Sequence, residues 1–126
     1  MSKKPQEWLK QAEYDIEVAE AMFEARKYIY TVFMCHLSVE KALKGLYVKV
    51  LKEEPPKVHN LILLLEKIEL EMPADLYEFV VEINRLSIAT RYPDDLQRMM
   101  KDYNKNITGG MVKKSREVLK WLKKQY

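Results

Sequence analysis

Three polar side chains recur every four residues in the most apolar part of the sequence. His36, Glu40 and Lys44 occupy positions i, i+4 and i+8, which lie on nearly the same face of a helix, and Lys41 lies beside them. These side chains are donors and acceptors suited to proton transfer or anion binding. The row is either a solvent-exposed set of ion pairs or a set of buried polar side chains. In the second case the side chains must have partners or border a cleft, because unpaired polar groups are costly to bury.

A second candidate is His59, which follows two prolines at an expected helix start. It could cap that helix, or it could meet an anion at the positive end of the helix dipole. Histidine is also the side chain best suited to change charge near neutral pH. A purely structural role is the alternative at this position.

The third candidate is the segment that begins at Arg91 and follows an expected core helix. Arg91 offers a rigid fork for phosphate or carboxylate, and Tyr92 offers a stacking face and a hydroxyl. Pro93 fixes the turn, and Asp94 or Asp95 could cap a following helix. Binding residues often lie on loops held by rigid elements, although an ordinary helix-ending turn would have the same residues.

Several common active sites are excluded. The chain has three glycines, too few and too poorly placed for a phosphate-binding glycine loop. A di-iron bundle needs Glu-x-x-His pairs, but Phe33 and Pro56 stand three residues before the two histidines. The single cysteine, Cys35, excludes an internal disulfide and a zinc site built on several thiolates. We therefore expect no metal and no cofactor.

Helical periodicity must position these residues. Apolar residues recur at spacings of three and four over about 5–25, and the segment 28–39 is apolar almost all round, as in a helix buried on most faces. We expect helices over about 5–25, 29–53, 58–70, 73–89 and 110–125, a loop over 95–108 with a helical turn at Leu96–Tyr103, and a hinge or loop end at Gly109-Gly110. The prediction is an all-α fold, an up-and-down bundle of four to five helices in a single domain spanning 1–126.

Composition narrows the function classes. The chain has 126 residues, 48% apolar and 33% charged, with a net charge of +3. This weak bias disfavours a dedicated nucleic-acid binder, although the basic C-terminal segment gives some support to RNA contact. The longest uncharged run, Tyr28–Val39, is shorter than the about 20 residues that a membrane span needs. The N-terminal residues lack the apolar region of a secretory signal, so we expect a cytoplasmic protein with no membrane partner.

Together these motifs resemble the HEPN domain family. The resemblance covers Trp8-Leu9 and the run from Ala12 to Asp15-Ile16, then Ser38-Val39-Glu40-Lys41-Ala42-Leu43-Lys44, His59-Asn60-Leu61 and Arg91-Tyr92-Pro93. It implies a helical bundle that is usually a homodimer. Many members pair with a minimal nucleotidyltransferase in toxin–antitoxin-like systems, others bind nucleotides, and a large group are metal-independent ribonucleases.

The ribonuclease members carry an arginine, four to six further residues and then a histidine. None of the five arginines here has that partner. The resemblance therefore implies a non-catalytic protein that binds a nucleotide, a minimal nucleotidyltransferase or both, with Lys41, Lys44, His59, Arg91 and Tyr92 around an anion. Supporting polar residues would be Asp15, His36, Glu40 and Asp94. The alternatives are a ribonuclease with an atypical active site, in which His59 or Tyr92 replaces the missing histidine, and a purely structural dimerising scaffold.

Overall fold

The computed structural model describes residues 3–126, and these residues form helices and connecting turns with no strand. In chain order the helices are α1 (Pro5–Glu24), α2 (Tyr28–Leu51), α3 (Leu61–Ile68), α4 (Ala74–Arg91), α5 (Leu96–Asp102) and α6 (Lys105–Lys123). The all-α bundle is confirmed, and the predicted count of four to five helices is corrected to six in the described chain.

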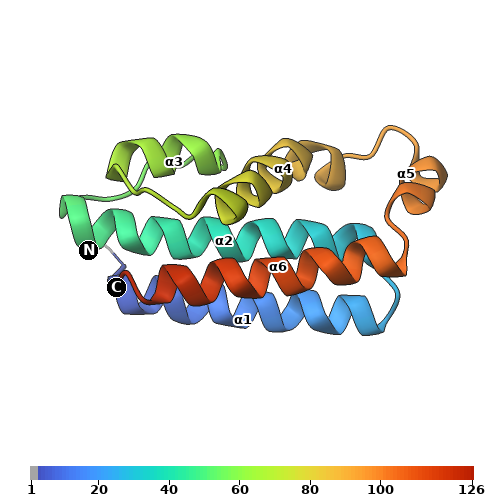
Figure 1. Cartoon of the computed structure of the whole chain (residues 1–126), viewed down its shortest axis with the longest axis horizontal. Helices are drawn as coiled ribbons and strands as arrows, with labels where there is room; N and C mark the ends of the chain where they lie inside the picture. Colours follow the sequence, from blue (N-terminus) through green and yellow to red (C-terminus); the bar gives the residue numbers. More distant parts are fainter. Residues whose placement is uncertain (1–2) are drawn as a thin grey trace.

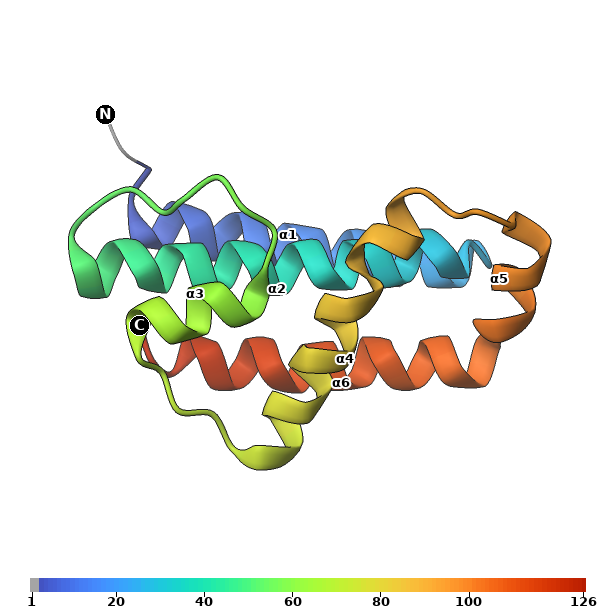
Figure 2. The same cartoon turned by 90° about the horizontal axis from the view of Figure 1, so that it is seen from above.

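The three long helices α1, α2 and α6 lie side by side, with α2 and α6 running in one direction and α1 in the other (Figure 1). Helix α4 crosses them obliquely, and α3 lies over the second half of α2 (Figure 2). Helix α2 contacts every other helix, which agrees with the expectation that it is buried on most faces. Its buried residues run almost without interruption from Cys35 to Tyr47, so polar side chains in this stretch must find partners inside the bundle.

The core consists of the apolar side chains on the helix faces that pack against α2. Its largest fully buried apolar residues are Ile16, Val32, Val39, Leu43, Leu46, Leu61, Leu64, Val80, Ile83, Val118 and Leu122. Burying such side chains contributes roughly 1.5–3 kcal/mol each, which is the main force that holds the bundle together. The regular spacing of the stripe explains why the sequence alone indicated α1, α2 and α4 well.

In the last third of the chain, the predicted helical turn is present and the predicted start of the last helix is wrong. Asp95 caps α5 by accepting a hydrogen bond from the Arg98 N–H, and the turn expected at Leu96–Tyr103 is this short helix. The Asn104 side chain caps α6 in the same way at the Ile107 N–H. Helix α6 therefore begins at Lys105 and continues through Gly109-Gly110 instead of hinging there.

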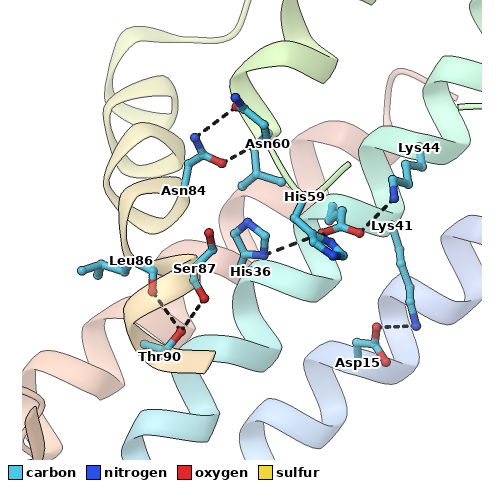
Figure 3. Close-up of polar contacts among 12 residues, drawn as sticks. Asp15, His36, Lys41, Lys44, His59, Asn60, Asn84, Leu86, Ser87 and Thr90 are labelled. Carbon is cyan, nitrogen blue, oxygen red and sulfur yellow. Dashed lines mark hydrogen bonds and ion pairs between the residues drawn. The ribbon is translucent and has the colours of Figure 1, made fainter. Parts of the chain in front are cut away.

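The start of α3 is set by Asn60 and not by residue 58 as predicted. The Asn60 side chain accepts hydrogen bonds from the backbone N–H groups of Ile62 and Leu63, at 3.0 and 3.2 Å. Asparagine is among the best residues at this position because its side chain satisfies the unpaired donors of the first turn. Residues 58–60 consequently lie outside the helix, and His59 is held in the segment that passes alongside α2 (Figure 3).

Three helices are followed by a non-glycine residue in the left-handed region. Arg26 follows α1, Lys52 follows α2 and Glu69 follows α3, with φ values of 61°, 58° and 52°. Such residues reverse the chain direction and let the helix end satisfy its last carbonyls. Each is strained relative to glycine, because a Cβ atom crowds the backbone in this conformation.

Gly45 allows the end of the chain to pack against α2. The Tyr126 hydroxyl donates a hydrogen bond to the Ala42 carbonyl oxygen, directly beside Gly45. A Cβ at position 45 would overlap the Tyr126 hydroxyl and lie 2.8 Å from the Trp8 Cβ. Burial raises the pKa of Tyr126 well above its usual value, so the hydroxyl keeps its proton and remains a donor.

Within residues 3–126, no helix has the length and apolar character needed to cross a membrane.

Candidate functional site

Glu40 is the centre of a polar cluster inside the bundle. Its carboxylate is buried, and its Oε2 accepts a hydrogen bond from the Lys44 Nζ at 3.1 Å. Its Oε1 lies 2.8 Å from the Nδ1 of His59 (Figure 3). The first partner follows from i, i+4 spacing on α2, and the second comes from the α2–α3 connection. One carboxylate therefore joins two elements and balances one buried ammonium.

His59 is the accessible member of this cluster. With the ring proton on Nδ1, it donates to Glu40, and Nε2 is then the free acceptor. The side chain of His59 is 54% exposed although that of Glu40 is 5% exposed. A carboxylate that orients an accessible imidazole is an arrangement able to accept a proton from a ligand or to donate to one.

His36 is the enclosed member of the cluster. Its ring is fully buried, and neither nitrogen has a hydrogen-bond partner. Burial lowers the pKa of His36 to about 4, and this outweighs the opposing effect of Glu40, whose oxygen lies 3.9 Å from Nδ1. His36 is therefore neutral at pH 7. It is thus a buried polar side chain of the cluster with no hydrogen-bond partner.

Arg91, the last residue of α4, lies close enough for its charge to lower the pKa of His36 further. Its guanidinium carbon sits 4.8 Å from the centre of the Phe33 ring, a cation–π contact. The Arg91 Nε is buried without a hydrogen-bond partner, and Arg91 makes no ion pair within residues 3–126. A buried arginine nitrogen with no acceptor is the type of group that an anion would satisfy.

Lys41 is turned away from this cluster. Its Nζ lies 2.9 Å from the Asp15 Oδ2 of α1 (Figure 3), so the two residues form a separate pair on the other side of α2. Lys41 lies about 100° from Glu40 around the helix axis, and its ammonium reaches Asp15 instead of Glu40. The structure therefore brings together His36, Glu40, Lys44 and His59, and it does not bring Lys41 to them.

Tyr92 and Asp94 lie outside the cluster. Tyr92 is 73% exposed, and neither side chain has a hydrogen bond or ion pair to any of the other candidate residues within the described chain. Tyr92 has its ring available to solvent beside Arg91, and Asp95 rather than Asp94 caps α5.

Sequence reasoning missed two residues that build the site. Asn84 of α4 accepts a hydrogen bond from the Leu61 N–H at 2.8 Å and donates to the Asn60 Oδ1, which ties α4 to the segment carrying His59. Phe33 supplies the surface on which Arg91 rests. Asn60 before an apolar run is a cap signal that the sequence does contain, whereas nothing local indicates the partner of Asn84.

The cluster and the nearby Arg91 together carry a positive excess. Lys44 and Arg91 are cations, Glu40 is the one carboxylate, and His36 is neutral at pH 7. Within residues 3–126, no group of three or more His, Cys, Asp and Glu residues is arranged to hold a metal ion. The arrangement can hold a small anion near Arg91 and exchange a proton at His59.

The sequence model of a known family, described as HEPN domain, matches residues 5–125. No curated protein matches the chain. Two solved structures share its fold over nearly the whole of both chains. The crystal structure of TT1696 from Thermus thermophilus has a TM-score of 0.82, is 22% identical, and the match covers 97% of this chain and 98% of that one. The crystal structure of ST0689, described as an archaeal HEPN homologue, has a TM-score of 0.78 at 23% identity, with 98% of each chain covered.

Proposed function

Because this chain belongs to the HEPN domain family, we propose that it is a non-catalytic binding protein that takes the phosphate of a nucleotide beside Arg91, His59 and Lys44. The observation that carries the proposal is the buried Arg91 Nε without an acceptor. His36, whose two nitrogens are also unpaired, lies within range of the Arg91 charge. Unsatisfied buried donors are costly, and phosphate oxygens are strong acceptors for a guanidinium.

The cluster contains one carboxylate, too few to neutralise the nearby cations, and this favours an anionic ligand. Glu40 is already engaged by Lys44 and His59, so it leaves the charge of Arg91 uncompensated. The exposed ring of Tyr92 follows Arg91 directly and offers a stacking surface for a base. Lys41, which is paired with Asp15, contributes to this site only through its effect on the α1–α2 contact.

Isothermal titration calorimetry with nucleoside triphosphates tests the ligand. We expect saturable heat with wild-type protein and at least a tenfold weaker affinity for Arg91→Gln, which keeps hydrogen-bonding capacity but removes the charge. Arg98→Gln is the matched control, because Arg98 is exposed on α5 and outside the cluster, and its affinity should be unchanged. Absence of heat with every nucleotide, or equal affinities for wild type and Arg91→Gln, would contradict the proposal.

We further propose a minimal nucleotidyltransferase as the protein partner, in a toxin–antitoxin-like pair. The family membership supports this, since the pairing is common among its members. Co-expression with a small nucleotidyltransferase encoded beside this chain, followed by co-purification and light scattering, is the test. A complex of fixed stoichiometry is expected, and two separately eluting proteins would exclude the pairing.

A homodimer is proposed from a stripe of exposed apolar residues on α4. Tyr77, Val81 and Ile88 are all exposed, and their spacing places them within roughly 40° on one face of the helix. A contiguous exposed apolar surface commonly marks an interface. Light scattering should give a dimer for wild type and a monomer for Ile88→Glu, with Lys113→Glu on α6 as the control. A monomeric wild-type protein would refute it.

The second candidate function is a metal-independent ribonuclease with an atypical active site. The specific observation in its favour is the Glu40–His59 pair, which presents an oriented and accessible imidazole. Labelled RNA incubated with wild type and with His59→Gln and Arg91→Gln variants separates the two proposals. Cleavage that both variants abolish would replace the non-catalytic proposal, whereas RNA left intact by wild type would exclude this enzyme.

A further inference from the structure

A separate cavity lies at the end of the bundle where α2 begins and α5 leads into α6. Its volume is about 440 Å³, within the range of small-molecule pockets. Its walls come from the α1–α2 turn, the first turn of α2, α5 and the start of α6. Glu40 lies eleven residues beyond Ile29 on α2, or roughly 16 Å at the helical rise of 1.5 Å per residue, so the cavity is distinct from the cluster around Glu40.

The walls of this cavity are apolar and aromatic. Tyr28, Tyr30 and Tyr103 line it together with Leu96 and Met100. Helix α5 has no buried residue, and Leu96 and Met100 remain 53% and 57% exposed although they face other apolar groups. The apolar surface of α5 is thus only half covered by the rest of the chain, and a ligand in the cavity would remove it from water.

The rim of the cavity is cationic. Arg26, Lys27 and Lys105 line it, and no Asp or Glu is among the lining residues. None of the three forms an ion pair within the described part of the chain, whereas Lys41, Lys44, Arg85, Lys114, Arg116 and Lys123 all do. Three uncompensated cations around a partly enclosed apolar space attract an anion more strongly than the same charges on an open surface.

From this combination we infer that the cavity binds a small amphipathic anion, a flat aromatic body joined to a carboxylate or sulfonate group. The aromatic body would pack between the tyrosine rings and the α5 side chains, where offset stacking and sulfur–aromatic contact with Met100 are favourable. The acidic group would meet Lys27, Lys105 and Arg26 at the rim. The ligand would also fix α5, since it supplies the contacts that α5 lacks.

The test uses the full chain labelled with ¹³C at the methionine methyl groups and titrated with naphthalene-2-sulfonate. We expect a saturable shift of the Met100 methyl signal and no shift of Met72, which packs against the core away from the cavity. The neutral naphthalene-2-sulfonamide should bind at least tenfold more weakly. Lys105→Gln should weaken sulfonate binding severalfold, and the Lys27→Gln/Lys105→Gln double variant more strongly, with Lys49→Gln on the exposed far part of α2 as the control.

Thermal unfolding of each variant in the absence of ligand shows whether it is folded, and Lys105→Gln is informative even where a change at Lys27 disturbs the start of α2. Equal affinities for the sulfonate and the sulfonamide would overturn the inference, as would shifts of Met72 as large as those of Met100. A Met100 signal that moves with protein concentration alone would also overturn it, because a second copy of the chain would then fill the cavity.

Discussion

The side chain of Asn84 completes the N-terminal cap of a helix to which it does not belong. Its Nδ2 donates to the Asn60 Oδ1 at 3.2 Å, and its Oδ1 accepts from the Leu61 N–H at 2.8 Å. Asn60 itself accepts from the next two backbone N–H groups. Helix α4 thus fixes the start of α3, and through it the position of His59, one residue before Asn60.

Asn84→Ala should lower the free energy of unfolding by about 1–2 kcal/mol, since it leaves a buried N–H without its acceptor. Asn60→Ala should cost about as much because it removes the cap. The double variant should lose less than the sum of the two, because the residues act on one cap. Urea denaturation measures all three, with Asn106→Ala on the exposed surface of α6 as the control. Strict additivity would contradict the shared cap.

Glu40→Leu should destabilise the protein by about 3–5 kcal/mol, because the Lys44 ammonium then lies buried without its counter-charge. The Glu40→Leu/Lys44→Met double variant should recover much of this loss, since both charges are gone. Chemical denaturation checks the order of the two variants. A double variant less stable than Glu40→Leu alone would show that the ammonium has another partner.

The unfolding free energy should fall as the pH drops below about 6.5. Burial holds the pKa of His36 at about 4 in the folded protein, whereas an unfolded histidine titrates near its usual value of about 6.5. Between these values the unfolded chain takes up a proton that the folded chain does not, so acid favours unfolding. The loss should reach about 3 kcal/mol by pH ~4.

This pH dependence is measured as the difference between wild type and His36→Gln, which cancels the titration of the carboxylates. This difference in unfolding free energy should change with pH over about pH 4–6.5. It should be independent of pH near pH ~7, where His36 is neutral in both the folded and the unfolded wild-type chain. A difference that does not change with pH would contradict the buried neutral imidazole.

Gly45→Ala should destabilise the protein by about 1–3 kcal/mol, although alanine favours a helix interior over glycine by about 0.5–1 kcal/mol. The new methyl would meet the Tyr126 hydroxyl and the rigid Trp8 Cβ. Gly110→Ala is the matched control, because nothing lies within 4 Å of a Cβ there, and it should be stabilising. The melting temperatures of the two variants should therefore move in opposite directions.

The fold was largely predictable because helical spacing is a property of the local sequence. The polar row of α2 was also predictable, since i, i+4 spacing alone places Lys44 beside Glu40. Helix geometry places Lys41 about 100° from Glu40 around α2, and its ammonium forms an ion pair with the buried Asp15 of α1. That outcome depends on which face of α2 packs against α1, which the pattern near Lys41 does not specify.

Other features depended on contacts between distant segments. Gly109-Gly110 suggests a chain break in isolation, but α6 continues through it because Gly109 packs against the Phe23 ring, 3.2 Å from the position of a Cβ. Asn84 reaches across to α3, and Phe33 meets Arg91 from another helix. Such pairs arise only when the helices are packed, so single-residue chemistry does not indicate them.

The left-handed residues Arg26, Lys52 and Glu69 have a consequence for engineering this bundle. Glycine at each position would relieve backbone strain by up to about 1 kcal/mol. The free energy of unfolding is therefore lower than the same fold could reach. At Lys52 and Glu69 that gain is free of conflict with the cavity, since neither lines it. Arg26 does line it. Glycine at that one residue would therefore raise thermal stability but remove a cation that the proposed anionic ligand would contact.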